Sequence, residues 1–305
     1  MNRLTILLIT ALAPIAWGTT YLVTTELLPV GHPMFAGLLR SLPAGLIAVA
    51  VSRTLPRGGW WFKSFALGAL NIGAFFPLLF LAAERLPGGV AAAVAGVQPL
   101  IVLSLGTLVL KERIRPMTAA AAVAGAGGVA LVVLGPAARL DALGILAALG
   151  GVTATALGMI LTKRWGRPVG VGPVGYAGWQ LAAGGLLQLP LTLLVEGTPA
   201  SIDSGAVLGY LWLATAGGII AYTLWFRGIQ KLPMIASGLL ALLSPVVATL
   251  LGTLVAGESF TPIQAVGFAI ALLALIGGQL SVRPAQNLQP PLVDPNAATA
   301  LTVGR

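Results

Sequence analysis

Two polar residues at equivalent points of two apolar segments carry the chemistry best suited to holding a small molecule. Gln98 and Ser244 each stand directly before a proline, Pro99 or Pro245, near the middle of a segment. A proline inside a helix removes one backbone hydrogen bond and frees the carbonyl four residues earlier. Those carbonyls belong to Ala95 and Ala241. The alternative to a ligand site is a pair of ordinary proline kinks in which both polar side chains bond locally.

Aromatic and amide side chains recur along single faces of the apolar segments. Trp17 and Tyr21 share one face by i, i+4 spacing, and Asn71 and Phe75 share another. Rings and amides together suit a substrate with an apolar body and a zwitterionic head, which favours amino acids, aromatic ones among them. Each aromatic residue taken singly fits packing or a membrane-interface belt equally well. The candidate substrate-binding residues are Trp17, Tyr21, Asn71, Phe75, Gln98, Met159, Tyr222 and Ser244.

Arg40 stands about eight residues into its apolar segment, roughly 12 Å along a helix. An ion at that depth in a membrane is a functional hypothesis by default. The side chain could also reach outward or pair with Glu26 or Glu84. We expect a gating or structural role for Arg40, as for Pro99 and Pro245, with direct substrate contact as the alternative.

Several kinds of chemistry are excluded by the residues that the chain lacks. It has no cysteine and one histidine, His32, so thiolate chemistry and a metal cluster are excluded. We expect no cofactor and no enzyme, because no segment carries a paired carboxylate or a serine with a base. None of the eight carboxylates lies near the middle of an apolar segment. Proton-driven carriers place such a group there, so a facilitator or exchanger is predicted.

The elements that must position these residues are membrane-spanning helices. The chain is 57% hydrophobic and 8% charged, with a mean hydropathy of +0.97, whereas soluble domains are about one quarter charged. Spanning a bilayer takes roughly 20 apolar residues, and no stretch remains for a separate soluble domain. The composition predicts an all-α polytopic membrane protein whose exterior faces lipid. The ten predicted spans are 4–24, 33–51, 64–83, 90–110, 117–135, 143–162, 174–194, 206–227, 235–256 and 262–281.

The basic residues predict the orientation in the membrane. The net charge of +9 comes in short bursts between apolar segments, which is typical of membrane topology and not of a nucleic-acid-binding face. If the N-terminus is cytoplasmic, 14 of the 17 basic residues fall inside. Both termini are then cytoplasmic, and we expect the cytoplasmic tail 283–305 to be disordered because it is polar and rich in proline.

An internal repeat with an offset of 146 residues divides the chain. The first repeat is predicted over 1–139 and the second over 140–282, with five spans in each. Because five is odd, the second copy is inverted, an architecture that supports alternating access. The alternative is a duplication kept only for packing. The matched pairs are Phe80 and Phe226, Leu86-Pro87 and Leu232-Pro233, Pro99 and Pro245, Glu112 and Glu258, and Pro116 and Pro262.

These features together resemble the bacterial drug/metabolite transporter superfamily. The resemblance covers residues 4–281 and rests on ten spans in two halves, on Leu86-Pro87 and on Lys-Glu-Arg-Ile at 111–114. The stretch 17–21, Trp-Gly-Thr-Thr-Tyr, and Arg40 are also similar to that family's pattern. The tandem EamA-type members, which include YddG-type aromatic amino-acid exporters, are the most similar. The resemblance implies transport of small metabolites by alternating access in a bacterial inner membrane. Efflux of drugs or other metabolites and a non-transporting membrane scaffold remain alternatives.

The fifth and tenth predicted spans carry small residues spaced for close helix contact. Ala120, Ala124 and Gly128 lie four residues apart in one span, and Gly267 and Ala271 do so in the other. Such faces predict either packing at the periphery of the bundle or a homodimer interface. The sequence does not choose between these two arrangements.

Overall fold

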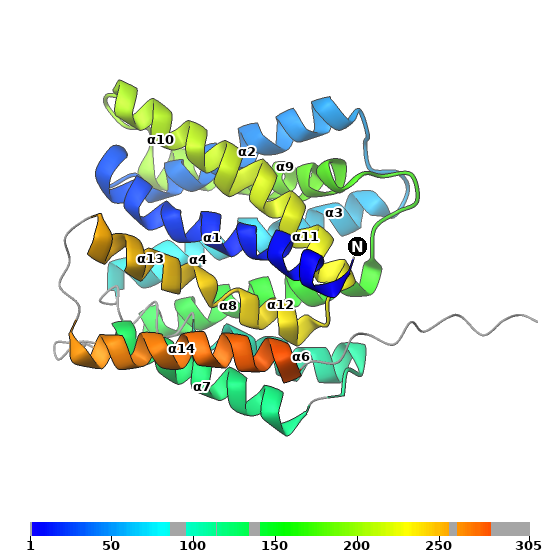
Figure 1. The fold of residues 1–305 in the computed structure, drawn as a ribbon. Helices are drawn as coiled ribbons and strands as arrows, with labels where there is room; N and C mark the ends of the chain where they lie inside the picture. The colour runs from blue at the N-terminus through cyan, green and yellow to red at the C-terminus, as the bar shows by residue number, and fades with distance from the viewer. Residues whose placement is uncertain (1, 86–95, 114, 134–140, 256–260, 282–305) are drawn as a thin grey trace, which may run out of the picture.

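The computed structural model describes residues 2–85, 96–113, 115–133, 141–255 and 261–281, and all regular structure within them is helical. The helices pack side by side and form one bundle (Figure 1). The α-helices are α1 Arg3–Leu27, α2 Pro33–Ser52, α3 Trp60–Gly68, α4 Phe75–Arg85, α6 Gln98–Leu110, α7 Pro116–Val133, α8 Ala142–Trp165, α9 Pro173–Leu191, α10 Ser204–Ala214, α11 Ala221–Lys231, α12 Met234–Leu240, α13 Leu243–Leu254 and α14 Pro262–Ser281. Three π-helices, η1 Ala69–Gly73, η2 Thr192–Glu196 and η3 Thr215–Ile220, continue α3, α9 and α10.

The all-α polytopic membrane fold predicted from the sequence is confirmed. Eight described stretches are long and apolar enough to cross a membrane, and two shorter apolar helices, Gln98–Leu110 and Pro116–Leu131, coincide with the fourth and fifth predicted spans. The start of the fourth predicted span, up to residue 95, lies outside the described residues, as does the predicted disordered tail 283–305. The third span begins earlier than predicted, at Trp60, and the eighth extends to Lys231.

Two π-helical segments repeat along the chain with the offset found in the sequence. Thr215, the first residue of η3, lies 146 residues after Ala69, the first residue of η1. Each segment interrupts a membrane span, η1 between α3 and α4 and η3 between α10 and α11. π-helical turns are rare and occur frequently at functional sites. The equivalent positions of η1 and η3 therefore make the third and eighth spans candidates for a functional site.

The two proline breaks lie where the sequence predicts them. Helix α6 begins at Gln98 with Pro99 in its first turn, and the ninth span breaks between α12 and α13, just before Pro245. The prediction of a freed carbonyl at Ala241 is wrong, because this oxygen accepts a hydrogen bond from the Ser244 backbone nitrogen at 3.1 Å. The chain at this break forms a hydrogen-bonded turn from Ala241 to Ser244. The matching carbonyl of Ala95 lies outside the described residues.

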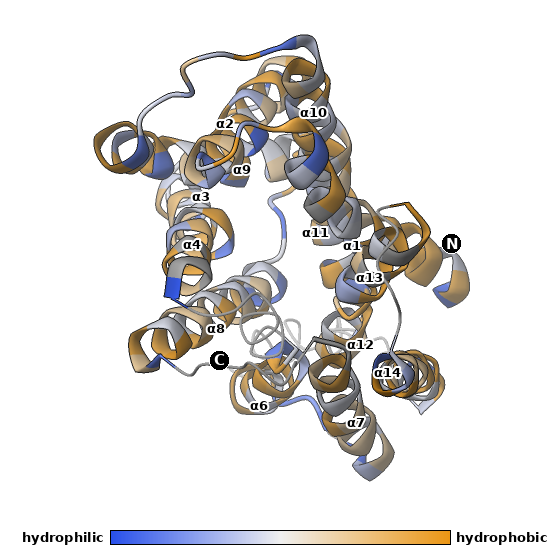
Figure 2. Cartoon of the chain, turned by 90° about the vertical axis from the view of Figure 1, so that its left-hand side faces the viewer, coloured by the Kyte–Doolittle hydropathy of each residue, from blue (hydrophilic) through white to orange (hydrophobic). Residues whose placement is uncertain are grey.

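The two halves of the chain pack together through glycines. Helix α2 lies against α9, where Gly45 contacts the backbone of Ala182 and Gly178 contacts Ala48 too closely to admit a Cβ. Helix α7 lies against α14 at one edge of the bundle (Figures 1 and 2). A Cβ on Gly128 would lie 2.7 Å from the Gly267 oxygen, which confirms the close contact predicted for the fifth and tenth spans. The homodimer stays a prediction, and its interface would lie outside this internal seam.

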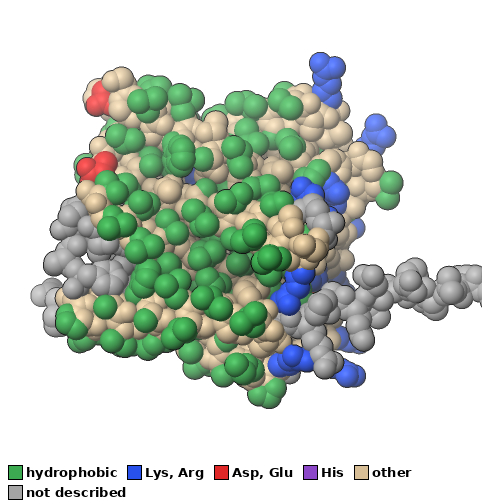
Figure 3. Space-filling view, in the orientation of Figure 1, with side chains coloured by type: hydrophobic (Ala, Val, Ile, Leu, Met, Phe, Trp, Pro, Cys, Tyr) green, Lys and Arg blue, Asp and Glu red, His purple; other side chains and the backbone are tan. Residues whose placement is uncertain are grey.

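The surface of the bundle has the polarity expected of a protein embedded in lipid. Hydrophobic side chains cover most of the face of the bundle that the space-filling view in Figure 3 shows. Lysine and arginine gather at the end of the bundle that holds the N-terminus, and acidic side chains lie at the opposite end (Figure 3). This separation is the one that the sequence predicts from the positive-inside rule.

Candidate functional site

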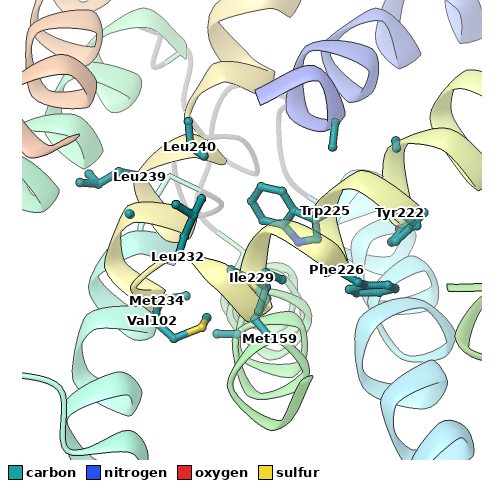
Figure 4. Packing of buried hydrophobic residues seen from close by; sticks show 14 of the residues in the cluster. Val102, Met159, Tyr222, Trp225, Phe226, Ile229, Leu232, Met234, Leu239 and Leu240 are labelled. Atoms are coloured by element: carbon teal, nitrogen blue, oxygen red, sulfur yellow. The ribbon is translucent and has the colours of Figure 1, made fainter. Parts of the chain in front are cut away.

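An aromatic cluster joins α1 of the first half to α11 of the second. The ring of Trp17 lies 5.1 Å from that of Tyr222 and 5.2 Å from that of Trp225, measured between ring centroids. Tyr222 and Trp225 are buried on one stretch of α11, together with Phe226 (Figure 4), whereas Trp17 is half-buried. Such tilted and edge-on contacts are the preferred geometry of aromatic pairs. The cluster is an apolar wall in which the Trp17 ring is partly exposed.

The carbonyl oxygen of Gly217 in η3 is the polar centre of this cluster. It accepts hydrogen bonds from Trp17 Nε1 at 3.0 Å and from Arg40 Nη2 at 3.2 Å. Trp17 and Arg40 stand on α1 and α2, so three helices from both halves converge on one backbone oxygen. The π-helical turn that carries Gly217 thus has a direct contact with two of the residues predicted from the sequence.

Arg40 is enclosed between helices and does not reach toward the outer surface. Its side chain is 7% exposed, and its Cζ lies 5.7 Å from the Phe76 ring centroid and 6.0 Å from that of Tyr222. The alternative in which it extends outward is therefore wrong. Among the described side chains, no carboxylate lies within 4.0 Å of its nitrogens, and Glu26 is exposed. The side chain of Glu84 lies outside the described residues.

A buried amide pair lies at η1, the first π-helical segment of the chain. Asn71 in η1 donates from Nδ2 to Gln180 Oε1 of α9 at 2.9 Å, and both residues are buried. Gln188, two turns along α9, donates from Nε2 to the Ile72 oxygen at 3.2 Å. Helix α8 approaches so closely at Gly158 that a Cβ there would overlap the Asn71 amide. These contacts tie η1 of the first half to α8 and α9 of the second.

Gln98 forms a separate contact between α6 and α8. Its Nε2 lies 3.4 Å from Thr155 Oγ1 and 3.6 Å from Met159 Sδ. Met159 is buried in the hydrophobic core with Val102 and Met234 (Figure 4), whereas Gln98 and Thr155 are half-buried. The side-chain amide of Gln98 is thus hydrogen-bonded, while part of the residue stays exposed.

The structure brings most of the predicted site residues together in pairs. Trp17 contacts Tyr222, and Gln98 contacts Met159. Asn71 and Phe75 both face α8, where Phe75 lies beside Gly151. The backbone of Ser244 packs against α1: a Cβ at Gly18 would lie 2.8 Å from the Ser244 carbonyl oxygen. The side chain of Tyr21 lies outside the described residues.

Sequence reasoning missed several residues of this region. Gln180 and Gln188 stand eight residues apart in an otherwise apolar segment, a signal that was open to inspection. Gly217 and Phe76 carried no such signal, because only the fold places them against Arg40. No group of three or more His, Cys, Asp or Glu side chains that could hold a metal occurs in the described part of the chain.

A salt bridge at the basic end of the bundle was also missed. Lys163 Nζ lies 3.3 Å from Glu112 Oε1, and it donates a hydrogen bond to the Leu232 oxygen. The second carboxylate oxygen of Glu112 accepts from the Met234 backbone nitrogen at 3.0 Å. This cluster joins the end of α6 to the end of α8 and the start of α12. It therefore links the two halves at the basic end of the bundle, and we call it the basic-end latch.

Comparison with protein families places both halves of the chain in one family. The model of the EamA-like transporter family matches residues 4–134 and again residues 142–277. Each match covers one of the two sequence repeats.

Individual relatives agree with that result. The chain is 44% identical to Protein PecM of Dickeya dadantii over 264 residues, which cover 87% of this chain and 89% of PecM. It is 27% identical to the uncharacterized inner membrane transporter YedA of Escherichia coli K12 over 272 residues, 86% of each chain. A crystal structure with 22% sequence identity superposes with a TM-score of 0.79 over 92% of this chain and 98% of the other, which supports the same fold.

Proposed function

The chain belongs to the EamA-like transporter family of the drug/metabolite transporter superfamily, and from that membership we propose that it exports amino acids, aromatic or apolar ones among them. It is a membrane transporter of small molecules. The observation that carries the finer proposal is the contact of the Trp17 ring with the Tyr222 ring, which joins the two halves. A second contact between the halves, from Gln98 to Thr155, adds an amide and a hydroxyl group.

The chemistry of these two contacts supports amino acids as substrates. An aromatic wall accommodates an apolar side chain, and half-buried amide and hydroxyl groups offer donors and acceptors for the polar head. Trp17, Phe75, Gln98 and Ser244 all keep intermediate exposure within membrane spans. Each therefore retains surface that a ligand could contact, unlike the fully packed core residues beside them.

The placement of the interruptions supports alternating access. The π-helices η1 and η3 lie at equivalent positions of the two halves, and the proline breaks of the fourth and ninth spans do so as well. Transporters with inverted repeats bind substrate at discontinuous helices and rock one repeat against the other. The basic-end latch between Glu112 and Lys163 is suited to hold one mouth closed while the other is open.

The membrane orientation and the energetics remain part of the proposal. We place the basic end, with both termini, in the cytoplasm of a bacterial cell because of the positive-inside rule. We propose a facilitator or exchanger, since the aromatic and amide contacts described for the site involve no carboxylate. Efflux of cationic drugs fits this site less well, because binding a cation favours an acidic group or a full aromatic cage.

Counterflow in proteoliposomes tests the proposal. Purified protein is reconstituted into vesicles loaded with single unlabelled amino acids, and uptake of the same labelled amino acid is followed. Saturable uptake of phenylalanine-, methionine- or threonine-like substrates, absent from protein-free vesicles, is the expected result. Uptake of drugs or other metabolites but of no amino acid would contradict the substrate class. No uptake of any compound by folded protein would favour the scaffold.

A further inference from the structure

We infer that Arg40 binds the carboxylate of the transported substrate, an inference that rests on the transport function proposed above. The observation behind it is a cation enclosed within a membrane span, with its charge not matched by any described carboxylate. The side chain stands about 12 Å along α2, well inside the span.

The contacts of the guanidinium leave much of its capacity unused. It has five N–H donors, and the described partners are the Gly217 oxygen at 3.2 Å and Thr20 Oγ1 at 3.5 Å, the latter at the limit for a hydrogen bond. The Nε atom is buried without a hydrogen-bond partner among the described atoms. Burial of a charge that is not paired is costly, and the cost is greater in a membrane than at a protein surface.

The aromatic surroundings stabilise the cation without neutralising it. The rings of Phe76 and Tyr222 lie 5.7 and 6.0 Å from Cζ, which is within reach of a cation–π interaction. They lie against the guanidinium, yet neither ring provides a hydrogen-bond acceptor for Nε. A small anion with two oxygens would supply both the missing charge and the missing acceptors.

The neighbouring residues indicate the side from which such an anion would approach. Thr20 and Trp17, both on α1, are half-buried, whereas Arg40, Phe76 and Tyr222 are buried. The half-buried Thr20 hydroxyl, 3.5 Å from Arg40 Nη1, is thus the least enclosed of the described neighbours that touch the guanidinium. The Trp17 ring stands over Tyr222 and shares the Gly217 oxygen with Arg40, so one ligand can contact a ring and the guanidinium together.

A purely structural role explains less of this arrangement. A neutral glutamine could also donate a hydrogen bond to the Gly217 oxygen, without the cost of a buried charge. Arginine is distinguished by its planar fork, which matches a carboxylate with two parallel hydrogen bonds. The site therefore favours zwitterionic or anionic substrates that carry a carboxylate, and disfavours amines that lack one.

Ligand pairs that differ only in the carboxylate test this inference. Thermal stabilisation of the purified full-length protein is measured with phenylalanine and phenylalaninamide, and with methionine and methioninamide. Stabilisation reports binding without requiring transport. For the wild type we expect the acid to bind about tenfold to a hundredfold more tightly than the amide, the range for a charge-assisted hydrogen bond.

Two substitutions of Arg40 separate binding from folding. In Arg40→Gln we expect acid and amide to bind alike, with the affinity for the amide unchanged, which shows that the site is intact. Arg40→Lys keeps a charge and should retain part of the preference. Arg57→Gln, at an exposed arginine on the basic end, is the matched control and should keep the full preference.

The outcomes distinguish this inference from the transport proposal. Equal binding of acids and amides by the wild type overturns the role of Arg40 and leaves amino-acid transport standing. If Arg40→Gln and Arg40→Lys both lose binding of the acid and of the amide to the same extent, Arg40 has a structural role and the inference is wrong. Saturable amino-acid binding that Arg40→Gln leaves unchanged overturns the inference as well. Absence of binding by the wild type, for acids and amides alike, overturns both proposals.

Discussion

Trp17 and Arg40, on consecutive helices of the first half, donate hydrogen bonds to the same acceptor, the carbonyl oxygen of Gly217 in the second half. The shared acceptor lies in a π-helical turn whose counterpart in the first half holds Asn71. One turn is therefore fixed by an indole and a guanidinium, and the other by an amide pair with α9. Both sets of contacts cross between the two halves of the chain.

Substitutions of Trp17 should separate its ring from its N–H group. Trp17→Phe removes the hydrogen bond to Gly217, whose net worth is about 0.5–1.5 kcal/mol, but keeps a ring against Tyr222. We expect a loss of substrate affinity below about tenfold for Trp17→Phe, given that hydrogen-bond energy, and a larger loss for Trp17→Ala. Competition for labelled substrate in proteoliposomes measures both. Equal substrate affinities of the wild type, Trp17→Phe and Trp17→Ala would show that Trp17 does not contact the substrate.

The close approach of α8 to η1 predicts a strong effect of one methyl group. Gly158→Ala places a Cβ into the Asn71 amide and should disturb its hydrogen bond with Gln180. Overpacking of this kind costs about 1–3 kcal/mol, so the thermal midpoint should fall. Gly127→Ala is the matched control, since a Cβ there meets nothing within 4 Å. A fall of the midpoint in both variants would show a general cost of alanine rather than a packing constraint.

The basic-end latch should control access from that end. Glu112→Gln removes the charge that pairs with Lys163, and we expect the basic end to open more often. The chain contains no cysteine, so a single cysteine introduced at Thr155 reports access without further changes. Labelling of Thr155→Cys from the basic side should become faster in the Glu112→Gln background.

The opposite end of the bundle offers a control for the latch. Arg85 and Asp141 form a long ion pair of 3.9 Å with both side chains more than 40% exposed, and exposed pairs contribute little. Arg85→Gln should therefore leave the labelling rate of Thr155→Cys from the basic side unchanged. A latch without function would show the same rate in all backgrounds.

The energetics of transport can be tested without substitutions. Because no carboxylate takes part in the described site contacts, the initial rate of net amino-acid transport should be the same with and without a pH gradient. Transport is compared in vesicles with a pH gradient, in vesicles with equal internal and external pH, and in vesicles whose gradient has been collapsed by a proton ionophore. A requirement of net transport for the gradient would contradict the facilitator or exchanger.

Much of the fold was predictable because its signals are local or strictly periodic. Long apolar segments must form helices in lipid, and the offset of 146 residues that pairs Pro99 with Pro245 also places η1 and η3. The spacing predicts that Asn71 and Phe75 share a face, and both do face α8. The proline at 245 predicts a helix break, but not that the Ala241 oxygen is taken up in a turn.

The contacts between helices were not predictable, since they depend on how spans far apart in the sequence are arranged. The sequence around Gly217 does not predict that its carbonyl oxygen binds Arg40, which lies 177 residues earlier. The pairing of Glu112 with Lys163 likewise depends on the meeting of α6 and α8. Gln180 could have been noticed as a polar residue in an apolar span, but its partner Asn71 could not.

Transport by the wild type and by Gln98→Ala tests the central claim most directly. Gln98 donates to Thr155 and stands next to Met159, whereas Ser104 on the same helix is exposed and bonds only to its own helix among the described contacts. We predict saturable amino-acid counterflow in the wild type and in Ser104→Ala, and a clearly raised half-saturation concentration in Gln98→Ala. Unchanged saturation in Gln98→Ala would contradict a substrate site that includes Gln98.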